Sequence, residues 1–182
     1  MRKIITLIVL LSCLSSSAQV QSDSIGIFAV HDGQHVRMER ITHQMIKTSG
    51  FALTGMRSKL EFKGATSPNQ FKGSARFMMY FGQPPADQMV NLYQFTAAYS
   101  PRNFEVARFE VKKKVRRLTG ISVSILGSTV GVESDDSLSV EVTELRKNVY
   151  VVDVTGSPGE YCFMFSANGS GGFGGVYDFT IE

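Results

Sequence analysis

Apolar residues recur at every second position over much of the chain after residue 24, which is the pattern of half-buried β-strands. The clearest case is the pair of segments 25–31 and 34–41. They flank Asp32-Gly33, a dipeptide typical of two-residue hairpin turns. With such a turn, one face of the hairpin collects the apolar side chains of Ile25, Ile27, Ala29, Val36 and Met38. The sequence therefore predicts an N-terminal hairpin with one face on a core.

Further apolar segments, separated by turn residues, are also predicted to be strands. They span residues 57–63, 71–81, 104–111, 115–126, 138–145, 149–155, 161–167 and 176–181. Residues 77–81 are apolar without alternation, which indicates a central strand covered on both faces. The segment 84–100 has some helical periodicity, but we expect a loop there. About nine or ten short strands of this kind predict an all-β chain that folds as a single antiparallel β-sandwich.

Residues 1–18 have the composition of a secretory signal peptide. A basic start is followed by an apolar run over residues 4–11, and the small residues Ser16 and Ala18 precede the expected cleavage point. The run is too short to span a bilayer, which needs about 20 residues. We therefore expect an exported protein without a transmembrane segment, in which residues 19–182 form one domain. Its destination is the periplasm, the outer-membrane surface or the medium.

The two cysteines bear on both anchoring and stability. Residues 10–13 loosely follow a lipobox, so the alternative to simple cleavage is a lipoprotein attached through Cys13. After cleavage at residue 18, Cys162 is the only cysteine left and no internal disulfide can form. Cys162 falls inside a predicted strand, where we expect it to be buried.

Several stretches of the chain resemble a known group of proteins. They are Pro158-Gly159-Glu160-Tyr161-Cys162-Phe163, Val176-Tyr177-Asp178-Phe179-Thr180-Ile181, Ser100-Pro101-Arg102-Asn103-Phe104, Val111-Lys112-Lys113-Lys114, and Ser58-Lys59 with Phe62 and Gly64. Together they resemble uncharacterised exported β-sandwich proteins of Gram-negative bacteria, which end in a "PGEY-x-F … V-[FY]-D-F-x-I" hairpin. The resemblance implies that the chain shares the β-sandwich fold of these proteins and is exported, and it implies no activity.

The same ending can be interpreted physically. Pro158-Gly159 favours a turn, after which Tyr161, Phe163 and Phe165 alternate onto one face of a strand. The final strand has its own such set in Tyr177, Phe179 and Ile181. Tyr161 at the start of its strand is typical of the tyrosine corner of sandwiches, in which the hydroxyl bonds to nearby backbone.

Motifs for metal, cofactor or catalytic chemistry are weak. His31 and His35 flank the tight turn, and the hairpin register places them on opposite faces, so they cannot readily share a metal. The glycine-rich run 168–175 is followed by a predicted strand and has no lysine, unlike a phosphate-binding loop. Acidic residues within 133–136 lack the spacing of a calcium loop and favour a solvated turn. We expect no catalytic, cofactor or metal site. Phe173, within the glycine run, is a candidate for contact with a partner.

A basic run is the remaining candidate for a site. Lys112, Lys114 and Arg116 would point to one side of an extended strand and face solvent, while Val115 points inward. Such a row either protects an edge strand from pairing or contacts an acidic surface glycan, a lipid headgroup or another envelope protein. Without Arg2 and Lys3 the formal charge falls from +3 to +1, which gives no case for nucleic acid.

These observations favour a non-enzymatic exported binding or interaction module at the cell envelope. The first alternative is a glycan-acting hydrolase whose two carboxylates converge from distant strands, a pair that a single sequence does not reveal. The second alternative is a structural component of the envelope. A pocket that holds two carboxylates would favour the hydrolase.

Overall fold

The computed structural model describes residues 25–51, 55–84, 86–87, 89–90, 92, 94–124, 127–130, 137–167 and 170–182. The signal-peptide prediction for residues 1–18 lies outside this range. Strands dominate the described residues, and the two helices are short: α1 (Gln94–Ala97) and the 3-10 helix η1 (Pro101–Asn103). No helix among them has the length and apolar character needed to cross a bilayer.

The strands form three sheets. Sheet A has the order β11 (Ser139–Arg146), β12 (Val149–Thr155), β6 (Ser74–Tyr80), β1 (Gly26–His31), β2 (Gln34–Arg37). Sheet B has the order β5 (Gln70–Phe71), β14 (Ser170–Ile181), β13 (Gly159–Ala167), β7 (Phe104–Arg108). Sheet C has the order β10 (Gly127–Val130), β9 (Val115–Ser124), β4 (Gly55–Lys63), β3 (Met45–Phe51), and β8 (Glu110–Lys112) also pairs with β9. The pairings are antiparallel, apart from the parallel pairing of β5 with β14.

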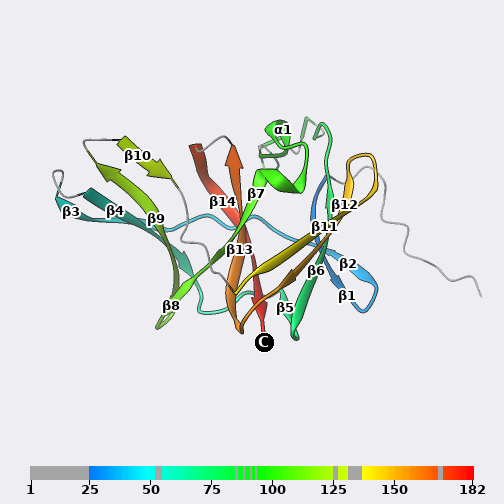
Figure 1. Cartoon of the computed structure of the whole chain (residues 1–182), viewed down its shortest axis with the longest axis horizontal. Helices are drawn as coiled ribbons and strands as arrows, with labels where there is room; N and C mark the ends of the chain where they lie inside the picture. Colours follow the sequence, from blue (N-terminus) through cyan, green and yellow to red (C-terminus); the bar gives the residue numbers. More distant parts are fainter. Residues whose placement is uncertain are drawn as a thin grey trace, which may run out of the picture.

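The predicted all-β sandwich is confirmed and consists of sheets A and B. In Figure 1, sheet C lies on the left, sheet B in the middle and sheet A on the right. Alternate residues of β13 explain this layering, since Tyr161, Phe163 and Phe165 join the core shared with sheet A. Cys162 and Met164 belong instead to a second apolar cluster, which includes Leu60, Phe62 and Leu118 of sheet C. Sheet B is therefore buried on both faces.

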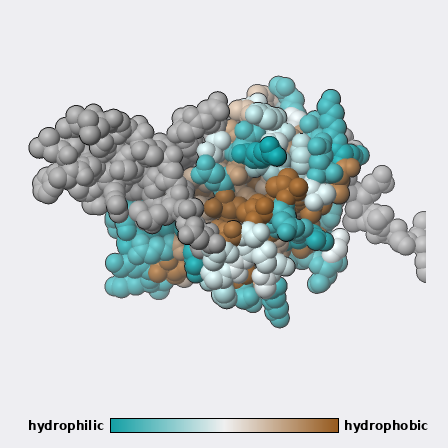
Figure 2. Space-filling view, viewed as in Figure 1, coloured by the Kyte–Doolittle hydropathy of each residue, from teal (hydrophilic) through white to brown (hydrophobic). Residues whose placement is uncertain are grey.

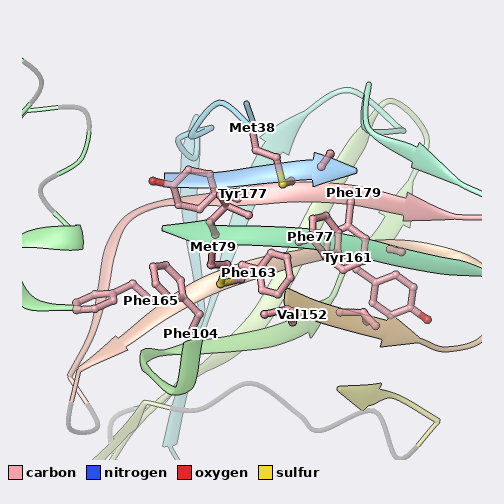
Figure 3. Close-up of a cluster of buried hydrophobic side chains, with 14 of the residues drawn as sticks. Met38, Phe77, Met79, Phe104, Val152, Tyr161, Phe163, Phe165, Tyr177 and Phe179 are labelled. Atoms are coloured by element: carbon pink, nitrogen blue, oxygen red, sulfur yellow. The ribbon is translucent and has the colours of Figure 1, made fainter. Parts of the chain in front are cut away.

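Aromatic rings hold sheets A and B together. Phe77 of β6 has no exposed surface. Its ring centroid lies 4.8 Å from that of Phe163 and 4.9 Å from that of Phe179, and Figure 3 shows the three side chains meeting between the sheets. At one end of the core, Phe95 of α1 packs against Phe104 with 5.4 Å between ring centroids. Helix α1 thus closes an end of the core that the strands leave uncovered.

The first hairpin has the predicted register. His31 pairs with Gln34 and Val30 with His35, and φ is positive at both turn residues, Asp32 and Gly33, as a two-residue type I′ turn requires. Of its predicted core face, Ile25, Ile27, Ala29 and Met38 lie in the main core. Val36, on the edge strand β2 of sheet A, is instead 47% exposed.

The predicted core face of the final strand and the predicted tyrosine corner are also confirmed. Tyr177, Phe179 and Ile181 all lie in the main core. The hydroxyl of Tyr161 donates a 2.6 Å hydrogen bond to the backbone carbonyl of Ser157, which is the tyrosine-corner contact. The central strand β6 is buried on both faces, since Phe77 and Met79 lie in the main core and Met78 and Tyr80 lie in a separate outer cluster.

The strand prediction was wrong in several details. Strands β3 and β10 were not expected, and the predicted strand 71–81 divides into β5 and β6 at Gly73, where φ is +74°. The predicted strand 104–111 divides into β7 and β8 around Phe109. In segment 84–100 the described residues are mostly loop, as predicted, but Gln94–Ala97 is helical.

Candidate functional site

The basic run 112–117 forms a hairpin in the structure, because the chain reverses at Lys113-Lys114 between β8 and β9. The backbone of Lys113 adopts the left-handed conformation, with φ at +58°. Lys112 pairs with Val115 and Val111 pairs with Arg116. Residues directly opposite each other share a sheet face, so Lys112 and Arg116 point to opposite faces.

The expectation that Arg116 faces solvent is therefore wrong. Lys112 and Lys114 are exposed as predicted, but Arg116 is only 3% exposed. Its side chain enters the space between sheets B and C. There the guanidinium carbon lies 5.2 Å from the centroid of the Phe109 ring. The side of β9 that packs against sheet B is the one that carries Arg116 and Leu118. The half-buried Val115 therefore lies on the outer face.

Arg116 holds two buried carboxylates. Its Nη1 atom donates hydrogen bonds to Asp178 Oδ2 at 2.5 Å and to Glu160 Oε2 at 3.2 Å. Glu160 is 6% exposed and Asp178 is 2% exposed. Glu160 also accepts hydrogen bonds from the hydroxyls of Thr66 and Thr180. The guanidinium of Arg116 thus links β9 of sheet C to β13 and β14 of sheet B.

The Arg116 network leaves no room for a substrate between its two carboxylates. The guanidinium occupies the space between the two carboxylates, and all three side chains are shielded from solvent. A buried charge needs a partner and hydrogen bonds to be tolerated, and the network supplies both. We interpret the Arg116 network as a structural link between sheets B and C.

Cys162 is fully buried beside this network, as predicted. Burial raises the pKa of its thiol well above the usual value, and the Asp178 carboxylate raises it further. Because the thiolate is the reactive form of cysteine, the raised pKa and the burial both make Cys162 inert in the folded protein.

We expect Cys162 to stay unlabelled when the folded protein is treated with Ellman's reagent at pH 8, and to react fully in guanidinium chloride. A free thiol with a pKa of about 8.5 reacts readily at that pH. Mass mapping of the labelled peptide separates Cys162 from Cys13. Rapid labelling of Cys162 in the folded protein would contradict the buried thiol.

The other residues singled out in the sequence do not come together. His31 stacks on Phe71, with 4.4 Å between ring centroids, and lies on the face opposite to His35, as the register predicted. No group of three potential metal ligands occurs among the described residues. The side chain of Phe173 and the acidic residues within 133–136 lie outside the described residues. Their predicted roles stay predictions.

A pocket of about 430 Å³ lies at the side of the sandwich where sheets A and B both end. β11 is the edge strand of sheet A and β7 is the edge strand of sheet B. Val142 of β11 pairs with the core residue Val152, so it faces inward, and yet it is 45% exposed. Figure 2 shows apolar residues gathered near the middle of this view, where Figure 1 places β7 and β11. The sandwich is open along this edge.

The pocket combines aromatic rings with charged groups. Its walls are formed by Tyr99, Ser100, Pro101 and Arg102 from the segment before β7, and by Val142, Glu144 and Tyr150 from the β11–β12 hairpin. Tyr99 is 73% exposed, whereas Tyr150 packs against Phe81 with 5.6 Å between ring centroids. Neither Arg102 nor Glu144 has an ion-pair partner in the described part of the chain. Both charged groups can therefore bind a ligand.

Sequence reasoning missed this pocket, although Ser100-Pro101-Arg102 was noted for its resemblance. The two walls lie about forty residues apart in the chain, and no local spacing connects them. The available signal was the alternation of Val140 and Val142 in β11, and the structure leaves both side chains 44% and 45% exposed.

The comparisons with known proteins give no relative. The chain matches no family model, no curated protein and no solved structure.

Proposed function

We propose that this protein is an exported, non-enzymatic binding module of the cell envelope, and that its open-edge pocket takes an acidic oligosaccharide. The observation that carries the proposal is the lining of the pocket, which combines two tyrosines with an arginine and a glutamate that have no ion-pair partner among the described residues. The signal-peptide pattern of residues 1–18 supports the exported location.

Each part of the lining suits a saccharide. The exposed ring of Tyr99 offers a flat amphipathic surface on which the apolar face of a sugar ring can stack. Arg102 presents a planar fork of donors, which matches a carboxylate in bidentate geometry. Glu144 accepts hydrogen bonds and so suits sugar hydroxyls. A rigid β-scaffold around a few convergent polar groups is a common form of binding site.

The lining favours binding over cleavage. Glycoside hydrolysis by its usual mechanisms needs two carboxyl groups that flank the scissile bond, and Glu144 is the only carboxylate among the described residues of the pocket. The carboxylates of Glu160 and Asp178, which also come together, are buried and bound to Arg116. The glycan-acting hydrolase is therefore the weaker candidate.

The test is retention on an array of acidic and neutral oligosaccharides. We expect the exported, processed protein to be retained on acidic members, and Tyr99→Ala to lower the affinity about tenfold by removing the stacking surface. Arg102→Gln should weaken binding of acidic oligosaccharides by tenfold or more and leave neutral ones unchanged, since a hydrogen bond to a charged group contributes about 1.5–3 kcal/mol.

Tyr99→Phe is the matched control, because it keeps the ring and removes only the hydroxyl. We expect it to bind within about twofold of the unsubstituted protein. Two results would contradict the proposal: no retention on any acidic oligosaccharide, or equal retention of Tyr99→Ala. Release of shortened saccharide from the bound ligand would favour the hydrolase instead.

A further inference from the structure

Four lysines that have no ion-pair partner among the described residues meet at one corner of sheet C. Lys63 of β4 and Lys112 of β8 both lie opposite Val115 of β9, one on each side, so they share the outer face. Strands lie about 4.8 Å apart, which places their backbones about 10 Å from each other. The backbone amide of Gly64 donates to the carbonyl of Lys114 at 3.1 Å, which brings the Lys113-Lys114 turn next to Lys63. We name Lys63, Lys112, Lys113 and Lys114 the lysine corner.

All four side chains of the lysine corner are exposed. None has an ion-pair partner in the described part of the chain, whereas the neighbouring cations do. Lys59 pairs with Glu110. Lys47 and Arg117 both donate to Glu61, and the hydrogen bond from Lys47 is the main cause of the lowered pKa of that carboxyl. The carboxylates of Glu61 and Glu110 on this face are thus already paired.

Folding concentrates positive charge on sheet C in a way that the small net charge of the chain, +3, does not reveal. Residues 45–63 and 110–124, which form β3, β4, β8 and β9, contain nine of the 19 Lys and Arg residues and two of the 16 Asp and Glu residues. Figure 2 shows hydrophilic residues gathered at the lower left, where Figure 1 places β8. Like charges held this close repel each other, so the corner is electrostatically unfavourable until an anionic partner covers it.

We propose that the lysine corner docks the protein onto an anionic phospholipid bilayer. Lysine is a point charge on a flexible stem, unlike arginine, which recognises fixed planar geometry. The corner is built around a turn, and the two carboxylates beside it, Glu61 and Glu110, already pair with other cations and so are not available to accept from sugar hydroxyls. Laterally mobile headgroups can adapt to such a cluster. Each lysine near an anionic membrane surface contributes about 1 kcal/mol, or about fivefold in partitioning.

The surface differs from the proposed saccharide pocket in both position and residues. The pocket is built from β11, β12 and the segment before β7, whereas the corner belongs to β4, β8 and β9. The docking proposal therefore does not depend on the proposed function, and each can fail without the other.

The test is co-sedimentation of the exported, processed protein with vesicles. Vesicles of equal parts phosphatidylcholine and phosphatidylglycerol should bind the protein in low salt and release it as salt rises. Pure phosphatidylcholine vesicles should not bind it. Lys63→Gln with Lys112→Gln should lower partitioning about 25-fold, and adding Lys113→Gln and Lys114→Gln should abolish it.

The matched control is Lys72→Gln with Lys147→Gln, which removes the same net charge from exposed turns elsewhere. We expect its partitioning to stay within about threefold of the unsubstituted protein, because the screened field falls off within a Debye length. An equal loss in the control would overturn the proposal. So would binding to pure phosphatidylcholine to the same extent, no binding to either vesicle, or corner-dependent retention on dextran sulfate without binding to vesicles.

Discussion

Arg116→Met will lower the free energy of unfolding by about 3–5 kcal/mol, the usual cost of removing one partner from a buried ion pair. The substitution leaves Glu160 and Asp178 facing each other between sheets B and C without the cation that holds them. Domains of this size have about 5–15 kcal/mol of total stability, so the variant should be close to unfolding at growth temperature. Urea unfolding followed by far-ultraviolet circular dichroism measures the change.

Lys114→Gln is the matched control for Arg116→Met, because both residues lie in the same basic hairpin and Lys114 is exposed. We expect its stability to change by less than about 0.5 kcal/mol. If Arg116→Met does not fold, the triple variant that adds Glu160→Gln and Asp178→Asn should recover stability, because it removes the unpaired charges. Equal stability of Arg116→Met and Lys114→Gln would refute the buried network.

Phe77→Ala will destabilise the protein by about 3–5 kcal/mol through the cavity it leaves between the sheets of the sandwich. Phe77 is fully buried, and its ring meets those of Phe163 and Phe179 at centroid distances of 4.8 and 4.9 Å. These contacts join β6 of sheet A to the two central strands of sheet B. The loss is measurable as a lower midpoint in urea or guanidinium chloride.

Tyr99→Ala provides the comparison for the core substitution. It removes a side chain of similar size that is 73% exposed, so we expect stability to change by less than about 0.5 kcal/mol. The same variant is expected to lose saccharide affinity, and an unchanged fold would assign that loss to the pocket. If Phe77→Ala and Tyr99→Ala were equally destabilising, the core between sheets A and B would be wrongly described.

Local patterns were sufficient to predict much of the sandwich. Asp32-Gly33 set the register of the first hairpin, and the alternation of Tyr161, Phe163 and Phe165 predicted which face of β13 joins the core. Both features depend on a side-chain period of two within a few residues. The tyrosine corner at Tyr161 was likewise predictable, because its partner, Ser157, lies only four residues away.

The third sheet and the Arg116 network could not be predicted in this way. Arg116 is separated from Glu160 and Asp178 by 44 and 62 residues, and its burial depends on how sheet C packs on sheet B. A run of lysines and arginines suggested one exposed row, but the positive φ of Lys113 creates a turn that sends Arg116 inward. The run of basic residues gave no indication of a turn at Lys113-Lys114.

The pocket and the lysine corner could not be predicted from the sequence either, because each combines segments that are far apart along the chain. The pocket combines a loop before β7 with a hairpin some forty residues later. The lysine corner combines Lys63 with a turn about fifty residues later. Composition was misleading here, because a formal net charge of only +3 conceals a sheet that carries almost half of the basic residues.

Backbone amide chemical-shift mapping tests the central claim, that the open-edge pocket is a binding site, most directly. The isotope-labelled protein is titrated with the acidic oligosaccharide that the array retains best. We predict shifts concentrated at the amides of residues 99, 100, 102, 142, 144 and 150, on both walls of the pocket, and no comparable shifts at the lysine corner. Saturable shifts centred on residues 112–114, or an unchanged spectrum at the highest saccharide concentration, would contradict the account.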